Sequence, residues 1–217
     1  LPIWDLWGQD NYCMIGNHAI PVLSDAILAN LPGIDKEATY RAMVESSTRP
    51  HLNSPFKIWE QYGYMPQNLQ NTSVSITLEQ AFDDWCVAQV AKHLGHTADY
   101  ERFSKRAQYY RNLYDPQTGF FRPKDDKGQW IEPFDPLSYE QPCFIEGNAW
   151  QYMWFVPQDP QGLMELMGGR DAFLKKLDEN FTLTATSGER NGNASGFIGQ
   201  YAHGNEPSHH TVYLYTM

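Results

Sequence analysis

Apolar residues recur every three or four positions along much of the chain, a spacing that predicts amphipathic helices. A first helix is expected to start at Pro21, because proline suits the first helical turn, and to end at the Leu-Pro-Gly stretch of residues 31–33. Asp35 is a suitable N-cap for a second helix, which carries Tyr40 and Met43 on one side. The two segments together predict a helical hairpin.

A second pair of helices is predicted further along the chain. Thr77 and Gln80 have the spacing of a capping box, and Gly95 is a suitable end for the helix that follows. Asp99 is expected to begin the next helix, whose apolar positions recur as far as Leu113. This pair repeats the hairpin arrangement of the first.

The remainder of the chain combines shorter elements with long loops. The sequence Asp126-Lys127-Gly128 lies between short aromatic stretches and predicts a small β-hairpin. Helices are expected over residues 147–155, after the Asp159-Pro160 pair and from Asp171. Helical hairpins without a heptad repeat, joined by long loops, favour part of a toroid of αα units over a four-helix bundle. The expected fold is therefore all-α, in one domain, with a small β-hairpin excursion.

Composition narrows the range of functions. The 217 residues are 41% hydrophobic and 14% aromatic, which is enough for a globular core. The formal net charge of -10 argues against nucleic-acid binding, and no apolar run approaches the roughly 20 residues that span a bilayer. The aromatic and carboxamide residues of the loops suit sugars, because sugar rings stack on aromatic faces while their hydroxyl groups bond to polar side chains.

One acidic residue, Glu146, lies in the densest aromatic stretch of the sequence, between Cys143 and Asp159. A carboxyl group desolvated by Trp and Phe side chains keeps its proton near neutral pH and can donate it to a leaving oxygen. We therefore interpret Glu146 as a candidate general acid. The alternative is a solvated residue at a helix start, where the helix dipole favours a negative charge.

Three other polar groups are candidates for ligand contacts. Asp83 and Asp84 are adjacent on a predicted helix and point about 100° apart, so one of them is expected to be structural. Asn17 and His18 precede a helix, where they can cap it or contact a hydroxyl group. Residues 203–210 contain three histidines, but a glycine and a proline interrupt any helix there, which favours a polar ligand-binding loop over a zinc site.

Long motifs rich in uncommon residues extend over nearly the whole chain. They are MIGNHAIPVLSDA, SVSITLEQAFDDWCVAQVAKHLG, YRNLYDPQTGFFRPK, PFDP, EGNAWQYMWFVPQD, GLMELMGG and GQYAHGNEPSHHTVYLY. In this order they resemble glycoside hydrolase family 92, the calcium-dependent exo-acting α-mannosidases. The resemblance implies inverting hydrolysis of terminal α-mannosides, with Glu146 as the general acid.

The resemblance also implies an (α/α)6 catalytic barrel preceded by a β-sandwich domain. Residues 1–217 are then expected to be one incomplete segment of the barrel, without the β-sandwich or the C-terminal part. Inversion needs a second carboxylate as base, and the family's motif for it has no counterpart here, so we expect the base outside this chain. The expected partners are a mannose-containing glycan, such as an N-glycan, and the rest of the parent polypeptide. The expected location is periplasmic or secreted.

Calcium is the cofactor that the resemblance implies, and its candidate ligands are Asn148, Gln151 and Glu206. Family members that favour α-1,2 bonds are expected to carry His-Glu where this chain has Asn205-Glu206, which argues against that linkage preference. The alternative function is a carbohydrate-binding or structural half-barrel without turnover. Our candidates for substrate binding are Asn17, His18, Asp84, Trp85, Trp150, His203, Asn205, Glu206 and His209.

Overall fold

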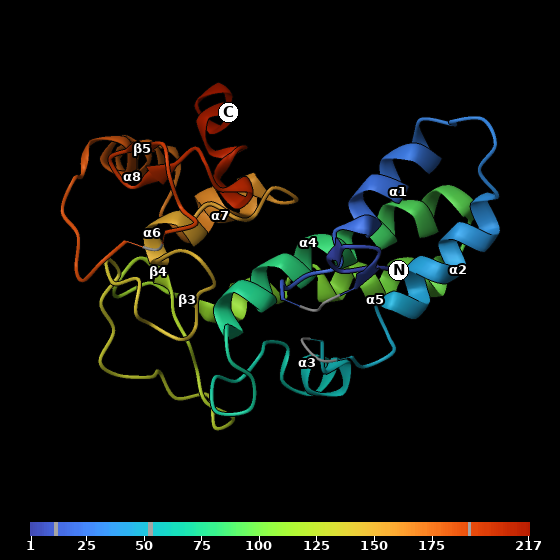
Figure 1. Cartoon of the computed structure of the whole chain (residues 1–217), viewed down its shortest axis with the longest axis horizontal. Helices are drawn as coiled ribbons and strands as arrows, with labels where there is room; N and C mark the ends of the chain where they lie inside the picture. Colours follow the sequence, from blue (N-terminus) through green and yellow to red (C-terminus); the bar gives the residue numbers. More distant parts are fainter. Residues whose placement is uncertain (11–12, 52–53, 191) are drawn as a thin grey trace.

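The computed structural model describes residues 1–10, 13–51, 54–190 and 192–217. Figure 1 shows a mostly helical chain in which one long helix, α4 (Ser73–Leu94), connects a group of helices from the first half of the sequence with a second group from the last third. Small two-stranded antiparallel sheets lie in the loops. The expectation of a largely helical segment is confirmed. Within the described ranges, no helix is both long and apolar enough to cross a membrane.

Helix α4 is buried along most of its length, on every side. It begins after Thr72, whose φ of 55° lies in the left-handed region, and it ends at Gly95, as predicted. The predicted capping box at Thr77 and Gln80 is wrong, because Thr77 lies inside the helix and its hydroxyl donates to the Ser73 carbonyl oxygen at 2.7 Å. The helix therefore starts five residues earlier than the capping signal indicated.

The C-terminal half of α4 packs against α1 (Ala19–Leu28), α2 (Lys36–Ser46) and α5 (Thr97–Arg106). Asp35 caps α2 as predicted, with its side chain accepting from the Ala38 amide at 3.0 Å. Both α1 and α5 begin two residues before the predicted positions. The core of this group includes Ile20, Ile27, Tyr40, Met43, Val87 and Phe103.

The predicted helix from Asp99 to Leu113 ends at Arg106 and is followed by a 3-10 turn, η1 (Tyr109–Leu113). The strands β3 (Tyr114–Asp115) and β4 (Phe120–Phe121) then pair as a short hairpin. The hairpin predicted around Asp126-Lys127-Gly128 is reduced to one bridge, between Lys124 and Trp130.

The C-terminal group forms a second core with the N-terminal half of α4. The helix expected over residues 147–155 is shorter, because α6 (Ala149–Tyr152) has only four residues. The predicted cap at Asp159 is confirmed. Neither α3 nor the β1–β2 hairpin was predicted. The remaining elements are β1 (Asp5–Leu6), β2 (Gln9–Asp10), α3 (Phe56–Tyr62), α6 (Ala149–Tyr152), α7 (Pro160–Leu166), α8 (Arg170–Thr182), β5 (Phe197–Ile198), β6 (Tyr201–Ala202), η2 (Glu206–Ser208) and η3 (Thr211–Thr216).

A buried ion pair joins α4 to α5. The Asp84 carboxylate accepts from Arg106 Nε at 2.7 Å and from a second guanidinium nitrogen at 2.8 Å. It also accepts from the indole Nε1 of Trp59, on α3, at 3.0 Å. Both charged side chains are almost completely buried and have lost their contact with water. Each charge is therefore stabilised mainly by the opposite charge of the other. The pair therefore fixes three helices relative to one another.

We expect Asp84→Asn to lower the free energy of unfolding by about 3 kcal/mol, because the buried Arg106 charge then has only Glu60 as an ionic partner among the described residues. The control is Glu45→Gln, which removes an exposed ion pair with Arg49 and should change stability by less than about 0.5 kcal/mol. Denaturant unfolding of the full-length parent protein measures both. Equal and small effects would contradict the structural importance of the Asp84 pair.

Candidate functional site

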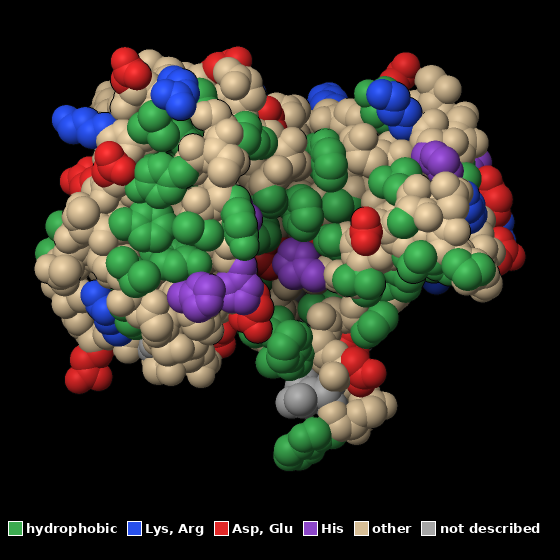
Figure 2. Space-filling view, turned by 90° about the horizontal axis from the view of Figure 1, so that it is seen from above, with side chains coloured by type: hydrophobic (Ala, Val, Ile, Leu, Met, Phe, Trp, Pro, Cys, Tyr) green, Lys and Arg blue, Asp and Glu red, His purple; other side chains and the backbone are tan. Residues whose placement is uncertain are grey.

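A cavity of about 700 Å³ lies where the two groups of helices meet. Figure 2 shows the corresponding hollow, with histidine and acidic side chains at its floor and apolar side chains around it. Its lining comes from the segment before α1, from α4, from the loop before α6, and from the loop that leads into η2. The site is thus assembled from segments far apart in the sequence.

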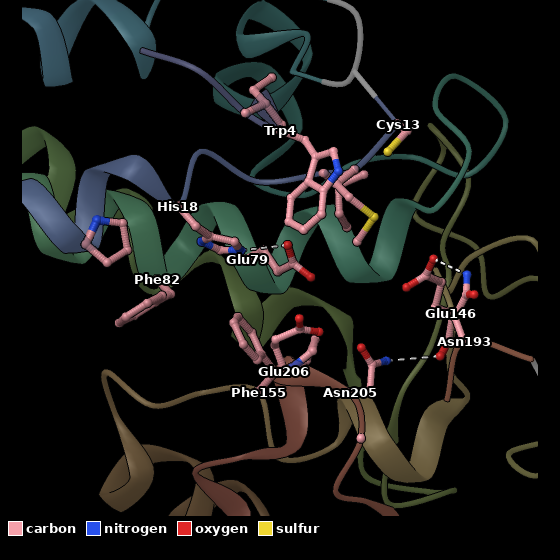
Figure 3. A pocket seen from close by; sticks show the side chains of 16 residues that line it. Trp4, Cys13, His18, Glu79, Phe82, Glu146, Phe155, Asn193, Asn205 and Glu206 are labelled. Carbon is pink, nitrogen blue, oxygen red and sulfur yellow. Dashed lines mark hydrogen bonds and ion pairs between the residues drawn. The ribbon is translucent and has the colours of Figure 1, made fainter. Parts of the chain in front are cut away.

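Three carboxylate side chains line this cavity. Glu79 comes from α4, Glu146 from the loop before α6, and Glu206 from the start of η2. Figure 3 shows Glu79 beside His18, and Glu146 on a different wall beside Asn193. A cavity with several carboxylates and few cations suits a neutral ligand that offers many hydroxyl donors.

The backbone at Glu146 is unusual, with a φ of 50°. A residue other than glycine adopts this left-handed conformation only at a cost, and such residues concentrate at functional sites. Asn193 Nδ2 donates to Glu146 Oε1 at 2.7 Å, and Asn205 Nδ2 donates to the Glu146 carbonyl oxygen at 3.2 Å (Figure 3). Two loops therefore hold the backbone and the carboxylate of Glu146 together.

The aromatic residues that follow Glu146 in the sequence do not enclose it. Trp150, Tyr152 and Trp154 are buried in the core, whereas Glu146 is partly exposed at the cavity wall. Phe155, the next aromatic residue in the sequence, does line the cavity. The expectation that Glu146 lies inside the aromatic cluster is therefore wrong, because the left-handed turn at Glu146 separates the acid from the helix that follows.

His18 bridges two acidic side chains of α4. Its Nδ1 lies 2.9 Å from Asp83 Oδ1, and its Nε2 lies 2.9 Å from Glu79 Oε2. Asp83 is itself fixed by the Asn17 backbone N–H, which donates to Oδ2 at 2.6 Å, and Glu79 Oε1 accepts from the Tyr152 hydroxyl at 3.1 Å. Glu79, Asp83 and His18 thus form one continuous network at the cavity wall.

The charge state of His18 follows from these contacts. Burial alone would lower the pKa of the imidazole, but the charges and hydrogen bonds of Asp83 and Glu79 outweigh it and hold the pKa well above its ordinary value. Burial raises the pKa of Glu79, and its contacts with His18 oppose that shift. We therefore describe His18 as an imidazolium between two carboxylates, with both ring nitrogens donating.

The other walls of the cavity are apolar. Trp4, Phe82, Phe155 and Pro207 face it, and Trp4 is 43% exposed. Figure 3 shows Trp4 on the opposite side of the cavity from Phe155. Flat apolar surfaces beside carboxylates and carboxamides match a sugar, which has apolar ring faces and hydroxyl groups at its edges.

Four of the predicted site residues reach the cavity, namely His18, Glu146, Asn205 and Glu206. Four others lie elsewhere. Asp84 is in the ion pair with Arg106, Trp150 is in the core against Phe120, and Trp85 stacks on Phe82. The side chain of Asn17 donates to the Ser46 carbonyl oxygen, so Asn17 reaches the site only through its backbone bond to Asp83.

The two predicted histidines of the C-terminal loop lie beside the cavity lining. His203 Nδ1 is 2.8 Å from the Tyr201 hydroxyl, and His209 Nε2 donates to the His203 carbonyl oxygen at 2.9 Å. Their rings also contact each other, with centroids 5.4 Å apart. These contacts shape the loop that carries Asn205 and Glu206, and substrate binding by His203 and His209 stays a prediction.

The predicted calcium ligands do not form a single ready site. Asn148 Oδ1 accepts from the Gln151 amide, and Gln151 Oε1 accepts from the Asn148 amide, each at 3.2 Å, in a buried capping box at the start of α6. Glu206 lines the cavity, but the other two residues do not. Among the residues that the structure describes, no three His, Cys, Asp or Glu side chains come together as a metal cluster either. The donor set of this trio does not fit one cation.

Glu79 is a site residue that the sequence motifs did not indicate. The adjacent acids Asp83 and Asp84 point apart, whereas Glu79 and Asp83 lie four residues apart on the same face of a helix. That spacing was the available signal. Asn193 carried no signal of its own, because only the folded loop brings it to Glu146.

Comparison with known proteins gives consistent matches. The family described as "Glycosyl hydrolase family 92 catalytic domain" matches residues 1–217. The structure is similar to the family GH92 alpha-mannosidase BT3965 from Bacteroides thetaiotaomicron, solved in complex with mannoimidazole, at 42% identity and a TM-score of 0.91, over 99% of this chain and 29% of that one. The inverting mannosidase BT2199 from the same organism is 35% identical with a TM-score of 0.87, over 99% and 31%.

A curated relative is more distant. An uncharacterized secreted glycosidase from Arthroderma benhamiae is 26% identical over an alignment of 200 residues, and the match covers 75% of this chain and 26% of that protein. The present chain therefore spans less than a third of the length of each of these relatives.

We expect the His18 imidazole to titrate above its ordinary pKa of about 6.5. Because the folded-state pKa is raised, the stability that this charge contributes is fully present below the unfolded-state pKa and is lost as the pH rises through the folded-state pKa. NMR titration of the imidazole in the full-length parent protein measures the shift. Asp83→Asn should lower the pKa of His18, whereas Asp25→Asn, an exposed change on α1, should leave it unchanged. A titration at or below about 6.5 would contradict the bridge.

Proposed function

Because the chain belongs to the glycosyl hydrolase family 92 catalytic domain, we propose that it is a segment of an inverting exo-α-mannosidase that hydrolyses terminal α-mannosides of glycans. The observation that carries this proposal is the position of Glu146, a motif residue held in a left-handed conformation at the wall of a cavity suited to a sugar. The segment is one arc of an (α/α)6 barrel. The remainder of the barrel and an N-terminal β-sandwich belong to the rest of the parent polypeptide.

Glu146 acts as the general acid. Its protonated carboxyl group donates to the glycosidic oxygen while the bond to the anomeric carbon breaks, so that the leaving sugar departs as a neutral alcohol. Asn193 and the left-handed backbone direct the carboxyl group toward the cavity. In an inverting mechanism a second carboxylate activates water on the opposite face, roughly 6.5 to 9.5 Å away, and we place that base outside this chain.

Asn205 and Glu206 border the part of the cavity that we assign to the leaving sugar. Both line the cavity, and Asn205 also supports the Glu146 backbone. One hydrogen bond therefore joins this loop directly to the backbone of the acid. With asparagine where a histidine is expected for α-1,2 bonds, we propose that the enzyme prefers another linkage.

The whole protein is proposed to need calcium, as the family resemblance implies. Since Asn148 and Gln151 are engaged in the α6 cap, we assign no catalytic step to a cation held by this chain. A periplasmic or secreted location is also part of the proposal, which the naming of the distant relative as a secreted glycosidase supports. A carbohydrate-binding half-barrel without turnover is the second candidate, because apolar faces and hydroxyl-binding groups line the cavity together.

In the full-length parent protein, Glu146→Gln should lower hydrolysis of mannosides with poor leaving groups by about two to four orders of magnitude. Activated aryl mannosides should be affected less, because their leaving groups need little protonation. Steady-state rates on both substrate types measure the difference. Glu101→Gln, an exposed change on α5, is the control and should leave both rates unchanged. Small and equal losses on both substrates would remove Glu146 from the acid role.

Exhaustive chelation of the full-length protein should abolish hydrolysis, and calcium should restore it better than zinc, because the expected ligands are oxygen atoms. Activity assays after dialysis against a chelator, with each ion added back separately, test this expectation. Full activity after chelation would contradict the calcium requirement.

A further inference from the structure

Glu79 is a buried carboxylate on the cavity wall to which the mechanism above gives no task. It is only 3% exposed, yet it lines the cavity. A buried charge is costly unless hydrogen bonds compensate for the lost water. The question is whether its protein partners are sufficient, or whether the carboxylate is also prepared for a ligand.

The neighbouring acid Asp84 provides an internal comparison on the same helix. The carboxylate of Asp84 accepts three hydrogen bonds from Trp59 and Arg106, and it lies away from the cavity. Among the described residues, Glu79 accepts only two, one at each oxygen, from His18 and Tyr152. Because each carboxylate oxygen can accept two bonds, Glu79 keeps capacity for further donors at the cavity wall.

The contact between His18 and Glu79 depends on a glycine beside it. Gly16, with a φ of 77°, lies against the contact between His18 and Glu79. A Cβ atom at Gly16 would be 2.7 Å from His18 Nε2 and 2.9 Å from Glu79 Oε2, closer than real Cβ atoms approach such atoms. The backbone therefore leaves space for this one contact, and Asp83 fixes the other side of the imidazole.

The charge of the network also points to a ligand rich in hydroxyl donors. The network sets two acidic side chains, Asp83 and Glu79, against the single imidazole of His18. Glu146 and Glu206 also line the cavity, and no Lys or Arg does so among the described residues. Hydroxyl groups of a sugar can donate to Glu79 without bringing a further charge.

We propose that Glu79 is a substrate-binding residue that accepts a hydrogen bond from one hydroxyl group of the sugar in the cavity, and that His18 is its positioning residue. This rests on the proposed mannosidase function. It goes beyond that function in assigning Glu79, Asp83, His18 and Tyr152 to one unit, which selects the sugar by a hydroxyl group and does not take part in proton transfer to the leaving oxygen.

The test is a comparison of Glu79→Gln with the unaltered full-length protein on an aryl α-mannoside and on its 2-, 3-, 4- and 6-deoxy analogues. Glu79→Gln should lower kcat/KM for the parent mannoside about 10- to 100-fold, as loss of a hydrogen bond to a charged group does. For one deoxy analogue the loss should nearly disappear, because the hydroxyl group that Glu79 binds is already missing. An equal loss on all five substrates would overturn the proposal, and so would no loss on any.

Three further variants separate positioning from folding. Asp84→Asn weakens a buried network on the same helix and should lower turnover of all five substrates by one common factor. His18→Gln keeps a donor for Glu79 and should give a smaller loss than His18→Phe, with the same single analogue spared. Equal sensitivity of all analogues in the His18 variants would remove the positioning role.

The proposed function has its own readout in this experiment. Hydrolysis of the parent mannoside by the unaltered protein tests the mannosidase function alone. If no hydrolysis occurs, calorimetric binding of methyl α-mannoside and its four deoxy analogues replaces kcat/KM, and Glu79→Gln must weaken binding of all but one of them. Absence of any binding by the unaltered protein would overturn the Glu79 proposal together with the sugar-binding cavity.

Discussion

The fold depends on the need to partner three carboxylates within two turns of the buried helix α4. Glu79, Asp83 and Asp84 lie at most 3% exposed, and each obtains its donors from another part of the chain. Asp84 pairs with Arg106 of α5, whereas Asp83 and Glu79 both contact His18, the residue just before α1. Glu79 also takes the Tyr152 hydroxyl from α6. These contacts join early, central and late segments of the chain. The hydrogen bonds that compensate the buried carboxylates of α4 therefore also assemble the cavity wall.

Local signals in the sequence predicted those elements whose ends depend on local contacts. Asp35 and Asp159 cap α2 and α7 because each side chain accepts from a backbone amide three residues ahead. The cap predicted at Thr77 is wrong for a physical reason. A threonine inside a buried helix can donate to the carbonyl oxygen four residues earlier, and its sequence pattern is the same as that of a cap. The start of α4 is set instead by packing, which a local pattern does not record.

The candidate site was predictable only in part, since its geometry depends on loops. Glu146 was found from its motif and His18 from its place before a helix. The prediction that aromatic side chains enclose Glu146 is wrong, because the aromatic residues that follow it in the sequence are buried in the core. Glu79 was available from its four-residue spacing to Asp83, but its meaning depends on His18, 61 positions away in the chain. Contacts of this kind arise from tertiary structure and leave no local pattern.

Glu146 shows how such long-range contacts govern chemistry. Its left-handed backbone costs on the order of 1 kcal/mol or more, and it persists because surrounding contacts hold it. Those contacts are Asn193, 47 residues later, and Asn205, 59 residues later. Asn205 thus borders the cavity and supports the acid at once. A substitution at Asn205 would change the sugar contact and the direction of the carboxyl group together, so its effect on linkage preference cannot be separated from its effect on catalysis by rate measurements on one substrate.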